Sequence, residues 1–125
     1  MAEVRVTSLC YTYGESAEQN QRKIAKLLKE YPNTDFLLLP EDTPDIDGRY
    51  AEKIPGPFSL WLQELACRFS INIIGPLTEK ADSALFSTCL IIGREGHIAG
   101  KYRKIQLSFS DTKIRHLTSG KTAKA

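Results

Sequence analysis

The sequence lacks any apolar run close to the roughly 20 residues that a membrane-spanning helix needs. Its N-terminus enters an alternating strand pattern directly, without the charged and apolar regions of a signal peptide. Only three cysteines occur in 125 residues, and an odd, widely spaced set argues against a disulfide framework. We therefore expect a cytoplasmic protein with no membrane partner.

An excess of one charge is also missing. The 17 Lys and Arg residues against 15 Asp and Glu residues give a formal net charge of +2. They form no basic stripe interleaved with aromatic residues, so nucleic acid is not an expected partner. A hydrophobic content of 42% and a charged content of 26% are ordinary for a globular chain. The length suits one domain or part of one.

Signatures of cofactor and metal sites are incomplete. Ser119-Gly120-Lys121-Thr122 resembles the end of a phosphate-binding loop, but Arg115 stands where its first glycine belongs. Neither His97 nor His116 has a second ligand at metal-binding spacing. No glycine-rich dinucleotide fingerprint follows the first two expected strands. We expect no metal or organic cofactor, and an unrelated nucleotide-binding module is a minor alternative.

What is present is an alternation of strand and helix patterns. Ser16, with Gln19 at the capping-box position, predicts the start of a helix that Pro32 and Asn33 end. Leu37 to Leu39 show no polar alternation, which is typical of a buried parallel strand. The expected elements are strands over 4–9, 36–39 and 71–74 (stopped by Gly75-Pro76), helices over 16–31 and 58–69, and a hairpin of strands 83–92 and 97–102 around 93–96.

This order, β-α-β-α-β-β-β, predicts an α/β fold with a mixed sheet and two helices on one face. Residues 105–125 are polar and weakly patterned, so we expect a weakly structured tail over 108–125. The other sheet face, with residues such as Leu37 or Leu39, would be exposed. Large exposed apolar patches and open sheet edges promote association. We therefore expect a homo-oligomer or a complementary fragment.

Two charged residues stand where strands end. Pro40 cannot donate to a ladder, so the strand before it stops and leaves Glu41 at its carboxyl end. Open α/β sheets bind ligands at that edge, and the long loop over 41–57 is typical of a functional segment. Lys104 follows the last expected strand, with Lys101 and Arg103 as alternatives for the same role. We expect the charged ends of Glu41 and Lys104 to lie within about 4–6 Å.

Five segments in fixed order make the chain resemble the nitrilase, or carbon–nitrogen hydrolase, superfamily. The resemblance runs from about Val4 to Gly120, nearly the whole chain. It implies the N-terminal half of an αββα sandwich that carries a Glu-Lys-Cys triad. The segments are Leu38-Leu39-Pro40-Glu41, Leu65-Ala66, Ile71-Asn72-Ile73-Ile74-Gly75, the turn at Gly96, and Tyr102-Arg103-Lys104-Ile105-Gln106-Leu107.

The resemblance implies hydrolysis of a non-peptide carbon–nitrogen bond in an amide, carbamoyl compound or nitrile, without a cofactor. Glu41 and Lys104 match the first two triad positions. The nucleophilic cysteine should follow some tens of residues after the lysine, but no cysteine comes after Cys89. Residues 1–125 would then be a partial domain, truncated before the nucleophile strand and inactive alone. We expect Cys10, at the end of the first strand, and Cys67 and Cys89 to be packing residues.

Two other interpretations stay open. The chain could be the non-catalytic product of a truncated gene, or a subunit of a split enzyme. Acyl transfer to an amine, as in membrane-bound members of the superfamily, is disfavoured because the sequence shows no transmembrane segment.

Overall fold

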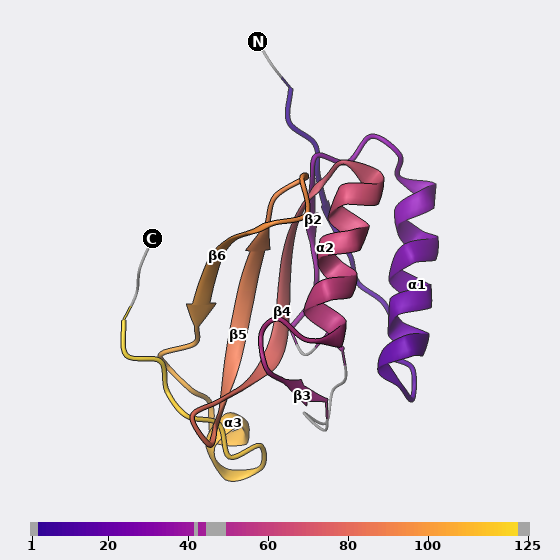
Figure 1. The fold of residues 1–125 in the computed structure, drawn as a ribbon. Helices are drawn as coiled ribbons and strands as arrows, with labels where there is room; N and C mark the ends of the chain where they lie inside the picture. The colour runs from indigo at the N-terminus through magenta and orange to yellow at the C-terminus, as the bar shows by residue number, and fades with distance from the viewer. Residues whose placement is uncertain (1–2, 42, 45–49, 123–125) are drawn as a thin grey trace.

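The computed structural model describes residues 3–41, 43–44 and 50–122. A mixed sheet in the order β1-β2-β4-β5-β6, with β3 beside β4, carries two long helices on one face (Figure 1). The elements are β1 (Val6–Ser8), α1 (Ala17–Glu30), β2 (Phe36–Leu38), β3 (Ala51–Glu52), α2 (Pro57–Phe69), β4 (Asn72–Ala81), β5 (Ala84–Ile92), β6 (Ile98–Arg103) and α3 (Phe109–Lys113).

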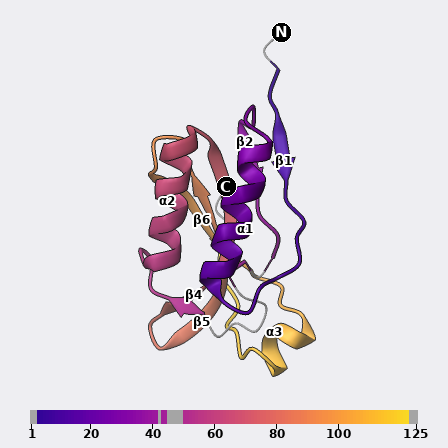
Figure 2. The ribbon, with the colours of Figure 1, turned by 90° about the vertical axis from the view of Figure 1, so that its right-hand side faces the viewer.

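The sheet is parallel on one side and antiparallel on the other. β1 pairs with β2, and β2 and β3 pair with β4, all in parallel. β4 with β5, and β5 with β6, are antiparallel. Turned by 90°, the molecule shows α1 and α2 side by side in front of the sheet (Figure 2). The predicted α/β class, with a mixed sheet and two helices on one face, is confirmed. No helix of the described residues is long and apolar enough to span a bilayer.

Helix α1 begins as its sequence predicts. The Ser16 hydroxyl accepts a hydrogen bond from the Gln19 backbone N–H at 3.2 Å. The Gln19 side chain accepts from the N–H of Glu15 rather than that of Ser16, so the reciprocal bond of a capping box is displaced by one residue. The helix faces the sheet with four buried residues, which are Ala17, Asn20, Ile24 and Leu28.

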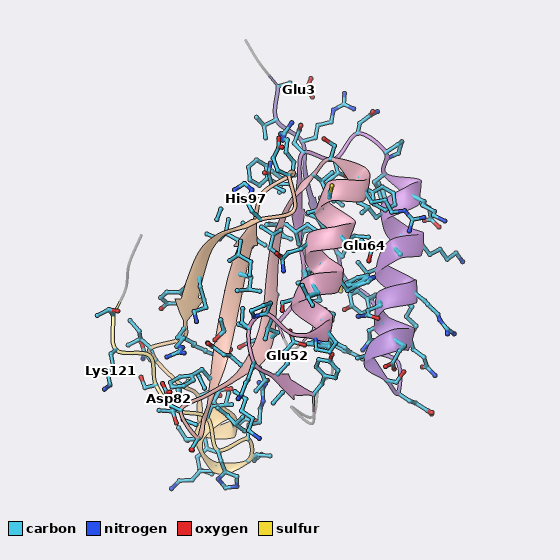
Figure 3. All side chains as sticks on the ribbon, in the orientation of Figure 1. Glu3, Glu52, Glu64, Asp82, His97 and Lys121 are labelled. Carbon is cyan, nitrogen blue, oxygen red and sulfur yellow. The ribbon has the colours of Figure 1, made fainter. Side chains whose placement is uncertain are left out.

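Helix α2 is capped by a residue of β3, the short strand before it. Pro57 occupies the first turn, where its missing N–H is harmless. The carboxylate of Glu52 accepts from the N–H groups of Phe58 and Ser59, both at 2.8 Å. Glu52 lies at the lower end of α2 in Figure 3. It belongs to β3, an element that the expected loop over 41–57 did not include. Residues 42 and 45–49 of that loop lie outside the described residues.

Strand β4 is longer than predicted. The expectation that Gly75-Pro76 stops it is wrong, because the ladder with β5 continues to Ala81. In a strand, the N–H groups of alternate residues point toward the same neighbouring strand. The Asn72 N–H points toward β2 and donates to Asp35 O, so position 76, four residues later, faces the same side. The missing donor of Pro76 therefore faces the β2 side, where β2 has already ended. A proline is tolerated at such an unpaired position.

Two turns shape the antiparallel side of the sheet. Asp82 and Ser83 connect β4 to β5 with φ values of 49° and 63°, as in the two-residue turns that match strand twist. The predicted hairpin joins β5 to β6, with Gly96 at φ 81°. The ladder between these strands contains an irregularity, because Ile91 pairs with Gly100 whereas Ile92 pairs with Ile98. Ala99 is the extra residue of this bulge.

The core lies between the sheet and the two helices. Leu37 and Leu39 are buried in it, so the prediction that they line the uncovered face is wrong. Side chains alternate along a strand, and in β2 it is Phe36 and Leu38 that point away from the helices. One cross-strand row on the uncovered face consists of Leu38, Ile74, Ile91 and Gly100. The next row consists of Pro76, Cys89 and Tyr102.

The segment after β6 contains one short helix, α3, which lies at the end of the sheet away from the N-terminus (Figure 1). The expectation of no regular element after Ile105 is wrong for this helix. Ser108 caps it and accepts from the Asp111 N–H at 3.1 Å. Two backbone bonds tie the following residues to the sheet, from Thr118 N to Leu85 O and from Gly120 N to Lys104 O. Residues 123–125 of the expected tail lie outside the described residues.

Candidate active site

Glu41 and Lys104 meet at one end of the sheet. Glu41 follows β2 and Lys104 follows β6, with β4 and β5 between these strands. The Lys104 ammonium donates a hydrogen bond to the Glu41 carboxylate, with Nζ to Oε1 at 2.7 Å. The prediction that their charged ends lie close together is confirmed. The side chain of Lys104 is 31% exposed and that of Glu41 is 58% exposed, so the pair is open to solvent and to a ligand.

A second carboxylate also holds the ammonium. Asp111 Oδ2 lies 3.0 Å from Lys104 Nζ, and the Asp111 side chain is only 5% exposed. The same carboxylate accepts from the Ser108 N–H at 2.9 Å, and its Oδ1 lies 3.6 Å from Arg115 Nη1. Asp111 was not among the predicted site residues. The available signal was the serine–aspartate spacing of a capping box at the start of α3.

Charge and hydrogen bonding stabilise the ionised forms of this cluster. The bonds to Glu41 and Asp111 raise the pKa of Lys104 and outweigh the opposing effect of burial. For Asp111, burial raises the pKa. The hydrogen bond from the Ser108 N–H and the Lys104 ammonium together lower it by more than burial raises it, so the net shift is downward. The site therefore presents a fixed ammonium between two carboxylates.

The loop that carries Glu41 is tied to the loop between β1 and α1. The Tyr13 hydroxyl donates to the Glu41 backbone carbonyl, and the Tyr11 hydroxyl donates to Thr43 Oγ1 at 3.2 Å. The Thr43 hydroxyl in turn donates to Pro40 O at 2.7 Å. Burial raises the pKa of Tyr11, with the Thr43 bond acting against it. These contacts were not predicted, because they depend on loops that the sheet brings together.

A further contact to this loop comes from α1. The side-chain amide of Asn20, fully buried on the helix, donates to Pro44 O at 2.6 Å. It also accepts from the Gly14 N–H at 2.6 Å. Asn20 thus joins both loops to the helix. Loss of either partner would leave a buried amide group without a hydrogen bond, which costs free energy.

A second charged cluster lies on the helix-covered face of the sheet. Glu79 of β4 is buried and accepts from Arg103 Nε and Nη2 and from Lys101 Nζ, each at 2.8 Å. Thr88 Oγ1 also donates to it, at 2.7 Å. Burial alone would raise the pKa of Glu79, but these donors lower it to about 2. Lys101 and Arg103 thus bind Glu79 and not Glu41. Of the three basic residues, Lys104 is the one that contacts Glu41.

The cysteines do not pack as expected. Cys10 and Cys67 are exposed and Cys89 is half-buried, so the expectation that all three are packing residues is wrong for the first two. Burial raises the pKa of the Cys89 thiol. In the described part of the chain, the ammonium of Lys104 has contacts to carboxylates and none to a thiol.

Metal and phosphate signatures lead to no site. Among residues 3–41, 43–44 and 50–122, no group of three or more His, Cys, Asp or Glu side chains could hold a metal ion. His97 lies in a turn at the end of the sheet opposite to Asp82 and Lys121 (Figure 3). Ser119 donates to Ile105 O, so the segment that resembles a phosphate-binding loop runs alongside the end of β6.

The structure thus joins a carboxylate and an ammonium at the strand ends of a mixed α/β sheet. Residues 5–122 match the family described as carbon-nitrogen hydrolase. The chain belongs to the carbon–nitrogen hydrolase family. It is 31% identical over 115 residues to the omega-amidase NIT2 of Xenopus tropicalis, a match that covers 86% of this chain and 42% of the relative. The human omega-amidase NIT2 is 44% identical over 59 residues, covering 46% of this chain and 21% of the relative.

Solved structures share the fold over about half their length. A carbon–nitrogen hydrolase from Helicobacter pylori superposes with a TM-score of 0.77 at 24% identity, covering 94% of this chain and 45% of that chain. A CN-hydrolase superfamily protein from Xanthomonas campestris gives a TM-score of 0.82 at 21% identity, covering 98% and 48%. The chain thus spans somewhat less than half of these proteins.

Proposed function

We propose that this chain supplies two catalytic groups of a carbon–nitrogen hydrolase, Glu41 as general base and Lys104 as the oxyanion donor. The observation that carries the proposal is the 2.7 Å contact between them at the carboxyl end of β2. Asp111 holds the same ammonium at 3.0 Å. A donor fixed before the reaction needs no reorganisation when negative charge develops on the substrate.

In the proposed reaction a cysteine thiol gives its proton to Glu41 while its sulfur bonds to the amide carbon. The Lys104 ammonium stabilises the resulting oxyanion. Collapse of this intermediate breaks the carbon–nitrogen bond, and the amine departs with the proton from Glu41, leaving a thioester. Glu41 then takes a proton from water as the water oxygen attacks the thioester, and returns it to the departing cysteine sulfur as the carboxylic acid is released.

The nucleophile is proposed to come from the half of the domain that residues 1–125 do not span, because no cysteine follows Cys89 within them. That half would cover the sheet face opposite the helices, where Ile91 is 45% exposed and Tyr102 is 40% exposed. Open apolar faces of this kind mark interaction surfaces. The relatives, more than twice as long as the matched segment, support a partner of about the same size.

The test begins with the genomic sequence immediately downstream, where a continuation with a strand ending in cysteine would identify the complement. The two polypeptides are then coexpressed and assayed for ammonia release, with an omega-amide first because of the relative's name. We expect no turnover by the chain alone, and turnover by the pair that Glu41→Gln and Lys104→Met each abolish. Glu64→Gln on the exposed side of α2 is the matched control and should keep activity.

If no such continuation exists, residues 1–122 can be fused to the C-terminal half of the Xenopus tropicalis relative. Turnover by the isolated chain that Glu41→Gln abolishes would contradict the proposal and would point to Cys10. A monomeric chain that binds no hydrophobic dye would show that the uncovered face needs no complement. A stable homodimer would show instead that a second copy covers it.

A further inference from the structure

The charged cluster around Glu79 includes Arg103, the residue that precedes the proposed catalytic lysine, Lys104. Arg103, held by Glu79, is the last residue of β6, and Lys104, held by Glu41, follows it and continues the ladder through its bond to Ser87 O. Consecutive side chains of a strand point to opposite faces of the sheet. We propose that Glu79 is a positioning residue, which fixes Arg103 on one face and thereby directs Lys104 toward Glu41 and Asp111 on the other.

The end of β6 benefits from such an anchor because few backbone hydrogen bonds hold it. β6 is the last strand of the sheet and pairs only with β5 among the described strands. Beyond Arg103, the strand-like contacts are two backbone bonds, from Lys104 N to Ser87 O at 2.8 Å and from Gly120 N to Lys104 O at 3.0 Å. An edge strand held by few backbone bonds opens easily at its end.

The contact between Glu79 and Arg103 has the geometry of an orienting device. Two guanidinium nitrogens donate to the two carboxylate oxygens, each at 2.8 Å, and such paired bonds fix a plane as well as a distance. The guanidinium also lies 4.0 Å above the centroid of the Phe86 ring. Lys101 makes one contact to the same carboxylate, so it contributes charge without fixing a plane.

The proposal rests on the proposed function only in giving Lys104 a catalytic role. Its geometric content can be tested on the chain itself through the reactivity of the Lys104 amine, which depends on how firmly Glu41 and Asp111 hold it. Competitive acetylation with trace acetic anhydride, followed by mass spectrometry, measures that reactivity relative to exposed Lys29 on α1. Release of the ammonium from its carboxylates lowers its pKa and speeds acetylation.

The two central variants remove charges of opposite sign. Glu79→Gln removes a negative charge, which by long-range electrostatics alone would speed acetylation of Lys104. Arg103→Met removes a positive charge, which by electrostatics alone would slow it. Loss of positioning instead predicts that both variants speed it, by at least about threefold. Lys101→Met is the matched control, since it removes the same charge as Arg103→Met but leaves the paired contact in place. It should not speed acetylation.

Slower or unchanged acetylation of Lys104 in Arg103→Met would overturn the proposal, as would an equal increase in Lys101→Met. If Glu79→Gln fails to fold, the comparison of Arg103→Met with Lys101→Met decides alone. These outcomes do not depend on turnover. A positive labelling result with an inactive enzyme pair would refute the proposed function, whereas the reverse combination would refute only the role of Glu79.

Discussion

Replacing Glu79 by glutamine should reduce stability at neutral pH and have a much smaller effect in strong acid. The folded pKa of Glu79 is about 2, against about 4.3 for an ordinary glutamate. Because the folded value is depressed, the carboxylate stabilises the fold above about pH 4.3. This contribution is lost progressively as the pH falls from about 5 to about 1, through the folded pKa.

The size of the effect follows from the same shift. A difference of about two pKa units corresponds to about 3 kcal/mol at pH 7 as an upper limit. The partners of Glu79 are partly in solvent, since Lys101 is 40% exposed and Arg103 is 30% exposed. Solvent screening weakens such pairs, so we expect a loss of about 1–2 kcal/mol in the free energy of unfolding.

Urea unfolding of both proteins at pH 7 and pH 2.5 measures this difference. Glu79→Gln should be less stable by the stated amount at pH 7 and by only about a quarter of that amount at pH 2.5. Glu64→Gln, on the exposed side of α2, should match the unmodified chain at both values. An equal loss at both pH values would refute the reasoning, because the cost would then come from shape and not from charge.

Three other substitutions test the packing. Phe58 is fully buried against two aromatic rings, so Phe58→Ala should cost about 3–5 kcal/mol in chemical unfolding, and Phe58→Leu clearly less. Glu52→Ala removes the cap of α2 and should lower the free energy of unfolding by about 1–2 kcal/mol, and Glu52→Gln should lower it by less. Equal free energies of unfolding for both variants and the unmodified chain would mean that the cap is unimportant. In Gly120→Ala the new Cβ would lie 2.4 Å from Arg103 O, so proteolysis after β6 should accelerate, and unchanged cleavage would contradict this contact.

Local signals explain the elements that were predicted correctly. Helix α1 begins directly after Ser16, because a side chain three residues from its partner can cap the helix without help from the rest of the fold. The end of β4 was wrong for the opposite reason. Whether Pro76 stops a strand depends on which neighbour its missing N–H would face, and that depends on where β2 ends. Helix α3, at five residues, is too short to show a helical repeat.

The candidate site was predictable in part. The position of Glu41 after a proline-terminated strand, together with the family resemblance, pointed to its contact with Lys104. Asp111 could not be found in the same way, because it lies on a short helix whose position at the end of the sheet is not visible in the sequence. Glu79 lay beyond the expected end of its strand, and only the ladder pairing reveals that it faces Arg103.

The bulge at Ala99 has a consequence for which residue reaches the site. Ile98 pairs on the helix-covered face, whereas Gly100, two positions later, pairs on the other face. One extra residue thus inverts the phase of the rest of β6. Without it, Lys104 would project toward the helices and Arg103 toward Glu41, with the composition of the strand unchanged. Deleting Ala99 should therefore exchange an ammonium for a guanidinium at the site, so that the identity of the cation there depends on a single insertion in an edge strand.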